Sequence, residues 1–172
     1  MTLSPRGVLK IRSSDQGNVI AEFNPIAIVH LDHQLSGSEL GVLKTVIDEG
    51  MRLGLRGGLL FVFDRKDVSR GIDPNGRALF ERLIRDGGHQ VGLSAVVIRS
   101  EGFAGALARG VVAGLLQLTR RRDHVKVFAA VEEACRALEE AHELEVGALL
   151  GAYTETMTRA RAAGVGPGVA LT

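Results

Sequence analysis

Three aspartates around one short loop are the residues of this sequence best suited to chemistry. Asp64, Asp67 and Asp73 follow an apolar run, and carboxylates at such a position can bind a hard cation such as Mg²⁺. A simpler interpretation is that Asp64 and Asp67 solvate a loop and that Asp73 caps a helix. We favour this second interpretation, so we predict neither a metal ion nor any other cofactor.

A second cluster contains His30, Asp32 and His33, whose side chains are of the types that bind zinc. In an extended strand His30 and Asp32 share one side and His33 lies on the other, because successive side chains alternate. Three converging ligands would therefore need a bend in the strand. We prefer an interpretation without a metal, in which the end of a strand emerges into solvent.

The sequence does not combine a nucleophile, a base and an orienting group in a recognisable pattern. Cys135 falls on the apolar side of a predicted helix, where a thiol is buried and inert. Neither a Gly-x-Ser-x-Gly elbow nor a phosphate loop ending in Gly-Lys-Ser/Thr occurs. Gly54, Gly57 and Gly58 precede a strand, whereas the glycines of a dinucleotide fingerprint follow one. We therefore predict that the protein is not an enzyme.

The composition argues against several classes of partner. The 172 residues have a formal net charge of +1, which gives no general attraction to nucleic acid or to an acidic membrane. With no tryptophan and one tyrosine, aromatic platforms for unpaired bases are scarce. The arginines at 120–122 can contact phosphate, but cations also stabilise the C-terminus of a preceding helix. The single cysteine fits a reducing compartment, although an exported protein with one buried thiol would fit equally. Because no apolar run resembles a signal peptide, we expect a cytoplasmic protein that does not bind nucleic acid, and we do not favour membrane contact.

The elements that position these residues alternate between strands and helices. Strands are predicted at 8–11, 19–23, 26–31, 59–63, 91–98 and 125–128, and the first two form a hairpin. Helices are predicted at 36–54, 74–86 and 103–118, from 131, and again after 147. The unbroken apolar run at 59–63 is typical of a strand covered on both faces, in the middle of a sheet. We expect one α/β domain with a mixed, mostly parallel sheet of about five or six strands covered by helices.

Local patterns define the ends and faces of these helices. Ser36 and Glu39 have the spacing of a capping box at the start of the first helix. The helix that begins at 131 places five charged residues on its solvent side: Glu132, Glu133, Arg136, Glu139 and Glu140.

The last part of the chain is predicted to be a helical extension. We assign residues 1–140 to the α/β domain and residues 141–172 to this extension and a loose tail. The extension has an apolar stripe that needs cover from the domain or from a second copy of the chain, so a homo-oligomer through this helix is one prediction. The stripe consists of Leu149, Leu150, Tyr153 and Met157.

From 26 to 138 the order of elements and several short motifs resemble the STAS family. These are the anti-sigma factor antagonist domains related to SpoIIAA, together with SpoIIAA-like relatives grouped with the lipid-binding SEC14 type. In the family, a strand ending in Asp leads to an Asp-Ser-Ser-Gly turn at a helix start. The matching segments here are LLFVFD at 59–64, IDPNG at 72–76, AVVIRS at 95–100 and VKVF at 125–128.

The resemblance implies a module that binds a protein partner at this helix start. In the family a serine there is phosphorylated, and the phosphate meets backbone N–H groups and adds negative charge. In this sequence Asn75 takes the position of that serine and Pro74 precedes it, so the usual switch is absent. Binding is then constitutive or uses another switch. Ser69 is a candidate for that switch, although an ordinary loop serine is the simpler interpretation.

We therefore expect a non-enzymatic regulatory or scaffold module that binds a protein partner through the loop and helix start around 68–77. The expected contact residues are Asp67, Val68, Ser69, Arg70, Asp73, Asn75, Gly76 and Arg77. The alternative, implied by the SEC14 type, is a lipid or small apolar ligand bound beside the apolar helix at 103–118, at a membrane surface contacted by residues 120–122.

Overall fold

The computed structural model describes residues 7–15, 17–32, 36–52, 57–64, 91–99 and 125–163. Its strands are β1 (Leu9–Asp15), β2 (Asn18–Phe23), β3 (Ile26–Leu31), β4 (Gly57–Phe63), β5 (Val91–Ile98) and β6 (Val125–Phe128). The described helices are α1 (Gly37–Arg52), α4 (Val131–Ala141) and α5 (Ala148–Ala163). None of the helices within these ranges is long and apolar enough to cross a lipid bilayer.

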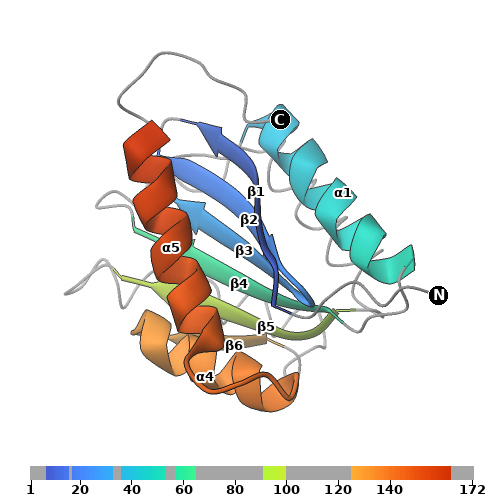
Figure 1. The fold of residues 1–172 in the computed structure, drawn as a ribbon, viewed down its shortest axis with the longest axis vertical. Helices are drawn as coiled ribbons and strands as arrows, with labels where there is room; N and C mark the ends of the chain where they lie inside the picture. The colour runs from blue at the N-terminus through green and yellow to red at the C-terminus, as the bar shows by residue number, and fades with distance from the viewer. Residues whose placement is uncertain are drawn as a thin grey trace.

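The six strands form one sheet in chain order (Figure 1). β1 and β3 run antiparallel to β2, which lies between them. β3, β4, β5 and β6 run parallel to one another. This mixed α/β sheet confirms the predicted fold class, including the leading hairpin and the C-terminal helix.

The described helices cover both faces of the sheet, with α1 on one face and α4 and α5 on the other (Figure 1). Leu60 and Val62 of β4 belong to the core under α4 and α5, whereas Phe61 belongs to the core under α1. Because β4 is interior in the strand order and has apolar neighbours on both faces, the prediction for the run at 59–63 is confirmed.

Side-chain caps fix the start of α1. The backbone N–H of Ser36 donates to Glu39 Oε2 at 2.7 Å, and the backbone N–H of Glu39 donates to Ser36 Oγ at 3.3 Å. Each residue thus satisfies a donor of the other, which is the predicted capping box.

The start of α5 is capped by a residue of α4. The buried carboxylate of Glu139 accepts hydrogen bonds from the backbone N–H groups of Gly147 at 3.0 Å and Leu149 at 2.9 Å. The helical pattern predicts Glu139 on the solvent side of α4. This prediction is wrong, because α5 covers the residue. The cap also stabilises the turn between the two helices, since the first N–H groups of a helix have no partner inside the helix.

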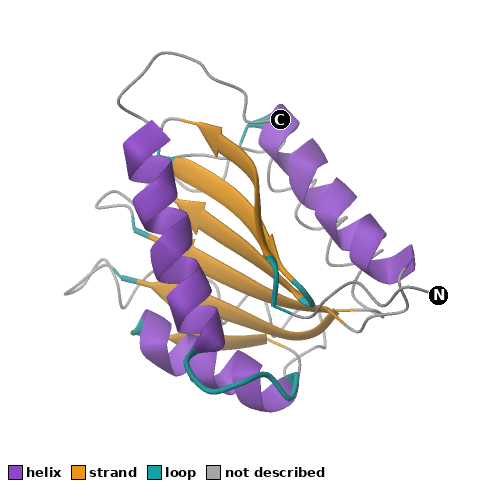
Figure 2. Cartoon of the chain, in the orientation of Figure 1, coloured by secondary structure: helices purple, strands orange, loops and turns teal. Residues whose placement is uncertain are grey.

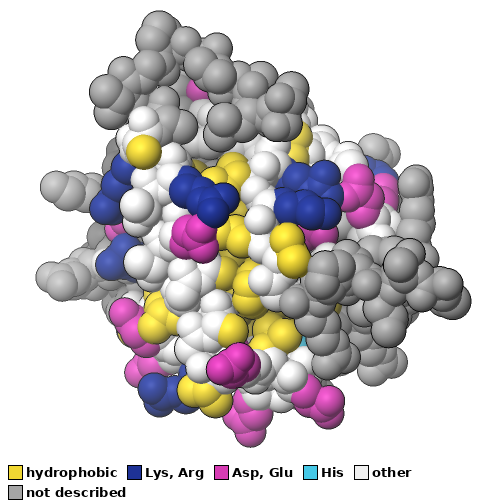
Figure 3. All heavy atoms as spheres, in the orientation of Figure 1, with side chains coloured by type: hydrophobic (Ala, Val, Ile, Leu, Met, Phe, Trp, Pro, Cys, Tyr) yellow, Lys and Arg dark blue, Asp and Glu magenta, His cyan; other side chains and the backbone are white. Residues whose placement is uncertain are grey.

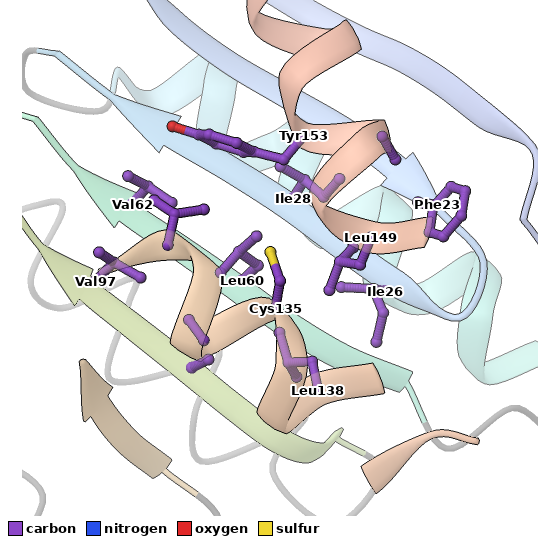
Figure 4. Close-up of a cluster of buried hydrophobic side chains, with 14 of the residues drawn as sticks. Phe23, Ile26, Ile28, Leu60, Val62, Val97, Cys135, Leu138, Leu149 and Tyr153 are labelled. Carbon is purple, nitrogen blue, oxygen red and sulfur yellow. The ribbon is translucent and has the colours of Figure 1, made fainter. Parts of the chain in front are cut away.

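The apolar stripe of α5 packs on the same chain. Leu149 and Tyr153 lie in the core cluster that also contains Ile28 of β3 and Cys135 of α4 (Figure 4). The other two residues of the stripe, Leu150 and Met157, are partly buried against this cluster. The body of the domain thus buries Leu149 and Tyr153 and covers Leu150 and Met157 in part.

Candidate functional site

Three charged residues follow the parallel strands at one edge of the sheet. β3, β4 and β5 have their carboxyl ends at this edge, on the left in Figure 2. Asp32, Asp64 and Arg99 come directly after these strands. The hydrogen bonds between the parallel strands continue into this row. The N–H of Asp64 donates to Leu31 O at 3.0 Å, and the N–H of Arg99 donates to Phe63 O at 3.1 Å. We call this row the carboxyl edge.

Asp64 and Arg99 form an ion pair that faces water. Arg99 Nη1 lies 3.4 Å from Asp64 Oδ2, and the two side chains are 48% and 38% exposed, respectively. A long, exposed pair of this kind contributes little to stability. Both charged groups therefore remain accessible for interaction with another molecule.

A buried polar pair lies next to this row. Nδ1 of His30 is 2.9 Å from the hydroxyl oxygen of Tyr153, and the two rings are tilted with centroids 6.1 Å apart. His30 is 3% exposed and Tyr153 is 7% exposed. His30 continues the side of β3 that carries Ile26 and Ile28, so it points toward α5.

Burial keeps both members of this pair neutral near neutral pH. It lowers the pKa of His30, whereas the carboxylates of Asp64 and Asp32 act in the opposite direction. Burial also raises the pKa of Tyr153 to about 12. The pair thus consists of an imidazole and a phenol, each able to donate or accept a hydrogen bond.

The position of His30 corrects the interpretation of the cluster at 30–33. His30 does not emerge into solvent, because α5 packs over this part of β3 and supplies Tyr153 as a partner. Asp32 is exposed, and its backbone N–H donates to Asn18 Oδ1 at 3.0 Å. His33 lies outside the described residues. Within the described ranges, no three His, Cys, Asp or Glu side chains converge as ligands for a metal ion.

The residues predicted to bind a partner lie outside the part of the chain that the structure describes. They are Asp67, Val68, Ser69, Arg70, Asp73, Asn75, Gly76 and Arg77. The helix at 103–118 and the arginines at 120–122, on which the lipid alternative depends, also lie outside it. Of the three aspartates considered as a cation site, the structure describes Asp64 alone, at the end of β4.

Cys135 lies where the sequence predicts it, in the core between α4 and the sheet. It is 1% exposed, and burial raises the pKa of its thiol to about 12. A thiol with so high a pKa is almost entirely protonated at neutral pH, and the protonated form is a poor nucleophile.

The sequence interpretation missed the pairing of His30 with Tyr153. One signal was present, because Ile26, Ile28 and His30 alternate along a strand and therefore share a face. That face belongs to the core, so a histidine on it needs a buried partner. The identity of the partner depends on the position of α5, which no local pattern specifies.

Comparison with known proteins gives no family assignment. No family model matches the chain, and neither the curated proteins nor the solved structures give a significant match.

Proposed function

We propose that this protein is a non-enzymatic regulatory or scaffold module of STAS-like type that acts in the cytoplasm. It binds a protein partner through residues 67–77, which follow β4 in the sequence. The observation that supports the proposal is the position of β4, which has parallel neighbours on both sides and continues through Asp64 toward this segment. Open α/β sheets bind their ligands outside the carboxyl ends of such strands.

The charges at the carboxyl edge suit a protein partner. Asp64 and Arg99 present opposite charges within 3.4 Å of each other, both partly exposed. A partner with complementary charges gains orientation and encounter rate from such an edge more than it gains affinity. Most of the affinity therefore comes from residues 67–77 themselves.

The residue at the helix start makes this binding independent of phosphorylation at that position. Asn75 has no hydroxyl group, so it cannot accept a phosphate. We therefore expect the partner to bind protein purified from a host that lacks the cognate kinase.

Photo-crosslinking tests the surface directly. A photoreactive phenylalanine analogue is placed at Val68 or Arg77, and at the exposed helix position Gly151 as a control. We expect crosslinks to one protein from Val68 and Arg77 and none from Gly151. The captured protein is identified by mass spectrometry and purified for titration.

Titration of that partner then tests the contact residues. Arg70→Glu and Gly76→Arg are each expected to weaken binding by tenfold or more, which is about 1.4 kcal/mol. The matched controls are Arg136→Glu and Gly151→Arg, which make the same chemical changes at exposed positions on α4 and α5. Wild-type affinity in folded Arg70→Glu and Gly76→Arg proteins would rule out this surface.

A further inference from the structure

The hydrogen bond between His30 and Tyr153 joins the sheet to the middle of α5. The two residues are 123 positions apart in the chain, and their contact is buried. Figure 4 shows the Tyr153 ring beside Ile28, with its hydroxyl group directed toward the carboxyl end of β3. The bond is therefore a polar contact inside an apolar interface.

Protonation of His30 would fix the direction of this hydrogen bond and add a charge to it. In the neutral imidazole, Nδ1 can accept a hydrogen bond from the hydroxyl group of Tyr153. In the imidazolium both ring nitrogens carry hydrogen, so Tyr153 must turn its hydrogen away and accept instead. The positive charge would also remain buried between α5 and the sheet, where an ion without a charged partner is costly.

The charged groups around His30 come from several elements. Asp32 follows its own strand, Asp64 follows β4 and Arg99 follows β5, while Arg161 belongs to α5. The carboxylates favour the imidazolium and the arginines oppose it. The other titratable neighbour is Cys135 of α4, which faces Tyr153 and is protonated at neutral pH.

Movement of α5 away from the sheet would favour the protonated form of His30. If residues 153–163 lift from the sheet, His30 gains water and loses the nearby charge of Arg161. Asp32 and Asp64 stay with the sheet, because they directly follow β3 and β4. Both changes favour the charged imidazole, so a proton binds more tightly to the open form than to the closed form. By linkage, binding of a proton must favour opening.

The two halves of α5 are held differently. Glu139 holds the first turn through two backbone N–H groups, and Leu149 is fully buried. Beyond Tyr153, Thr156 is buried, but Met157 is only partly buried, and Thr158 and Arg159 are exposed. The end of the helix after Thr156 therefore has fewer buried contacts than the first turn, which favours opening from that end.

We propose that α5 is a cover controlled by protons, in which protonation of His30 releases residues 153–163 from the sheet and uncovers the apolar surface around Ile28. Figure 3 shows that hydrophobic side chains already gather beside α5 on this face. Opening would extend this surface toward the carboxyl edge. The cover does not depend on the partner proposed above.

Hydrogen exchange of the whole protein, read by mass spectrometry, tests the cover. Exchange is measured at about pH 7.5 and about pH 5.5 and is corrected for the intrinsic pH dependence of amide exchange. We expect protection of residues 153–163 to fall by up to about tenfold at the lower pH. Protection of α1, which packs on the other face, is the internal reference.

Two variants separate the effect of protonating His30 from the effect of its hydrogen bond with Tyr153. His30→Asn keeps an acceptor near the position of Nδ1 but does not titrate, so the loss of protection at low pH should disappear. Tyr153→Phe keeps the titrating group and removes the hydroxyl, so protection should be weaker at both pH values and still depend on pH. His142→Gln changes another described histidine, at the end of α4, and should keep the pH-dependent loss of protection whatever it does to overall stability.

The proposal would be overturned if His30→Asn lost protection of residues 153–163 at the lower pH as the wild type does. It would also be overturned if His142→Gln showed no such loss. If His30→Asn does not fold, the His30 ring of the wild type is titrated by NMR. Protonation of that ring without any change in the protection of residues 153–163 would also overturn the proposal.

Discussion

At the scale of single residues, two glycines bring the ring of His142 against the sheet. A Cβ on Gly58 would lie 2.6 Å from His142 Nε2 and 2.5 Å from Ile26 Cδ1, and a Cβ on Gly92 would lie 3.2 Å from His142 Cε1. The absence of side chains at these positions of β4 and β5 lets the end of α4 approach the strands. A larger residue at position 58 or 92 would press against the His142 ring unless that ring moved.

Gly58→Ala should destabilise the protein by about 1–3 kcal/mol, because Ile26 and His142 must both move from their packed positions. Urea unfolding followed by circular dichroism measures the change. Gly41→Ala is the matched control, since a Cβ there has nothing within 4 Å. It lies in α1, where alanine should add about 0.5–1 kcal/mol of stability. Equal effects of the two substitutions would contradict the packing argument.

At the scale of elements, the connection between α4 and α5 depends on one carboxylate. Oε2 of Glu139 accepts the N–H of Gly147 in a partly buried position, and Oε1 accepts the N–H of Leu149 in a buried one. An amide oxygen can replace one of these acceptors, but an amide nitrogen cannot accept a hydrogen bond. The two oxygens of Glu139 thus have separate, measurable roles.

Glu139→Gln should lower the free energy of unfolding by about 1–3 kcal/mol, because it removes a charged acceptor and leaves one of the two N–H groups without its partner. Thermal and urea unfolding provide the measurement. Glu140→Gln, the same change at the exposed neighbouring position, should change stability by less than about 0.5 kcal/mol. A neutral Glu139→Gln variant would show that water or another group replaces the lost acceptor.

The sequence predicts those elements whose patterns are local. The bounds of β3, β5 and β6 agree with the predicted runs because alternation and apolar content are properties of each segment. The capping box of Ser36 and Glu39 is also local, since it joins residues three apart. Glu139 was assigned to the solvent side because α4 alone would expose it.

The candidate site could be predicted only in part for the same reason. Asp64 follows a strand whose central position is readable from its unbroken apolar sequence. The ion-pair partner of Asp64 cannot be predicted from a local pattern. Arg99 is 35 positions away and meets Asp64 through the pairing of β4 with β5. His30 and Tyr153 meet across an even longer separation.

At the scale of the whole molecule, the last helix covers strands from the beginning of the chain. α5 packs on β1 and β2 as well as against α4. Phe23 and Ile28 share a core cluster with Leu149 and Tyr153. The face of the leading strands is therefore completed by α5.

A chain that ends at Gly147 should fail to reach the native fold, because it lacks the helix that buries this face. We expect aggregation, or binding of a dye that reports exposed apolar surface, together with loss of the cooperative unfolding transition. A chain that ends at Ala163 keeps α5 and is the control. Cooperative unfolding of the shorter chain at wild-type stability would contradict this role of α5.

The long separation of His30 and Tyr153 in the sequence also has a consequence for synthesis of the protein on the ribosome. A ribosome must add the 123 residues from His30 to Tyr153 before that contact can form. At about 5–20 residues per second, this takes on the order of 6–25 s. During that interval the nascent hairpin presents a bare apolar face, so chaperones have time to bind it. A premature stop codon just before the codons of α5 would then be about as harmful as an early one.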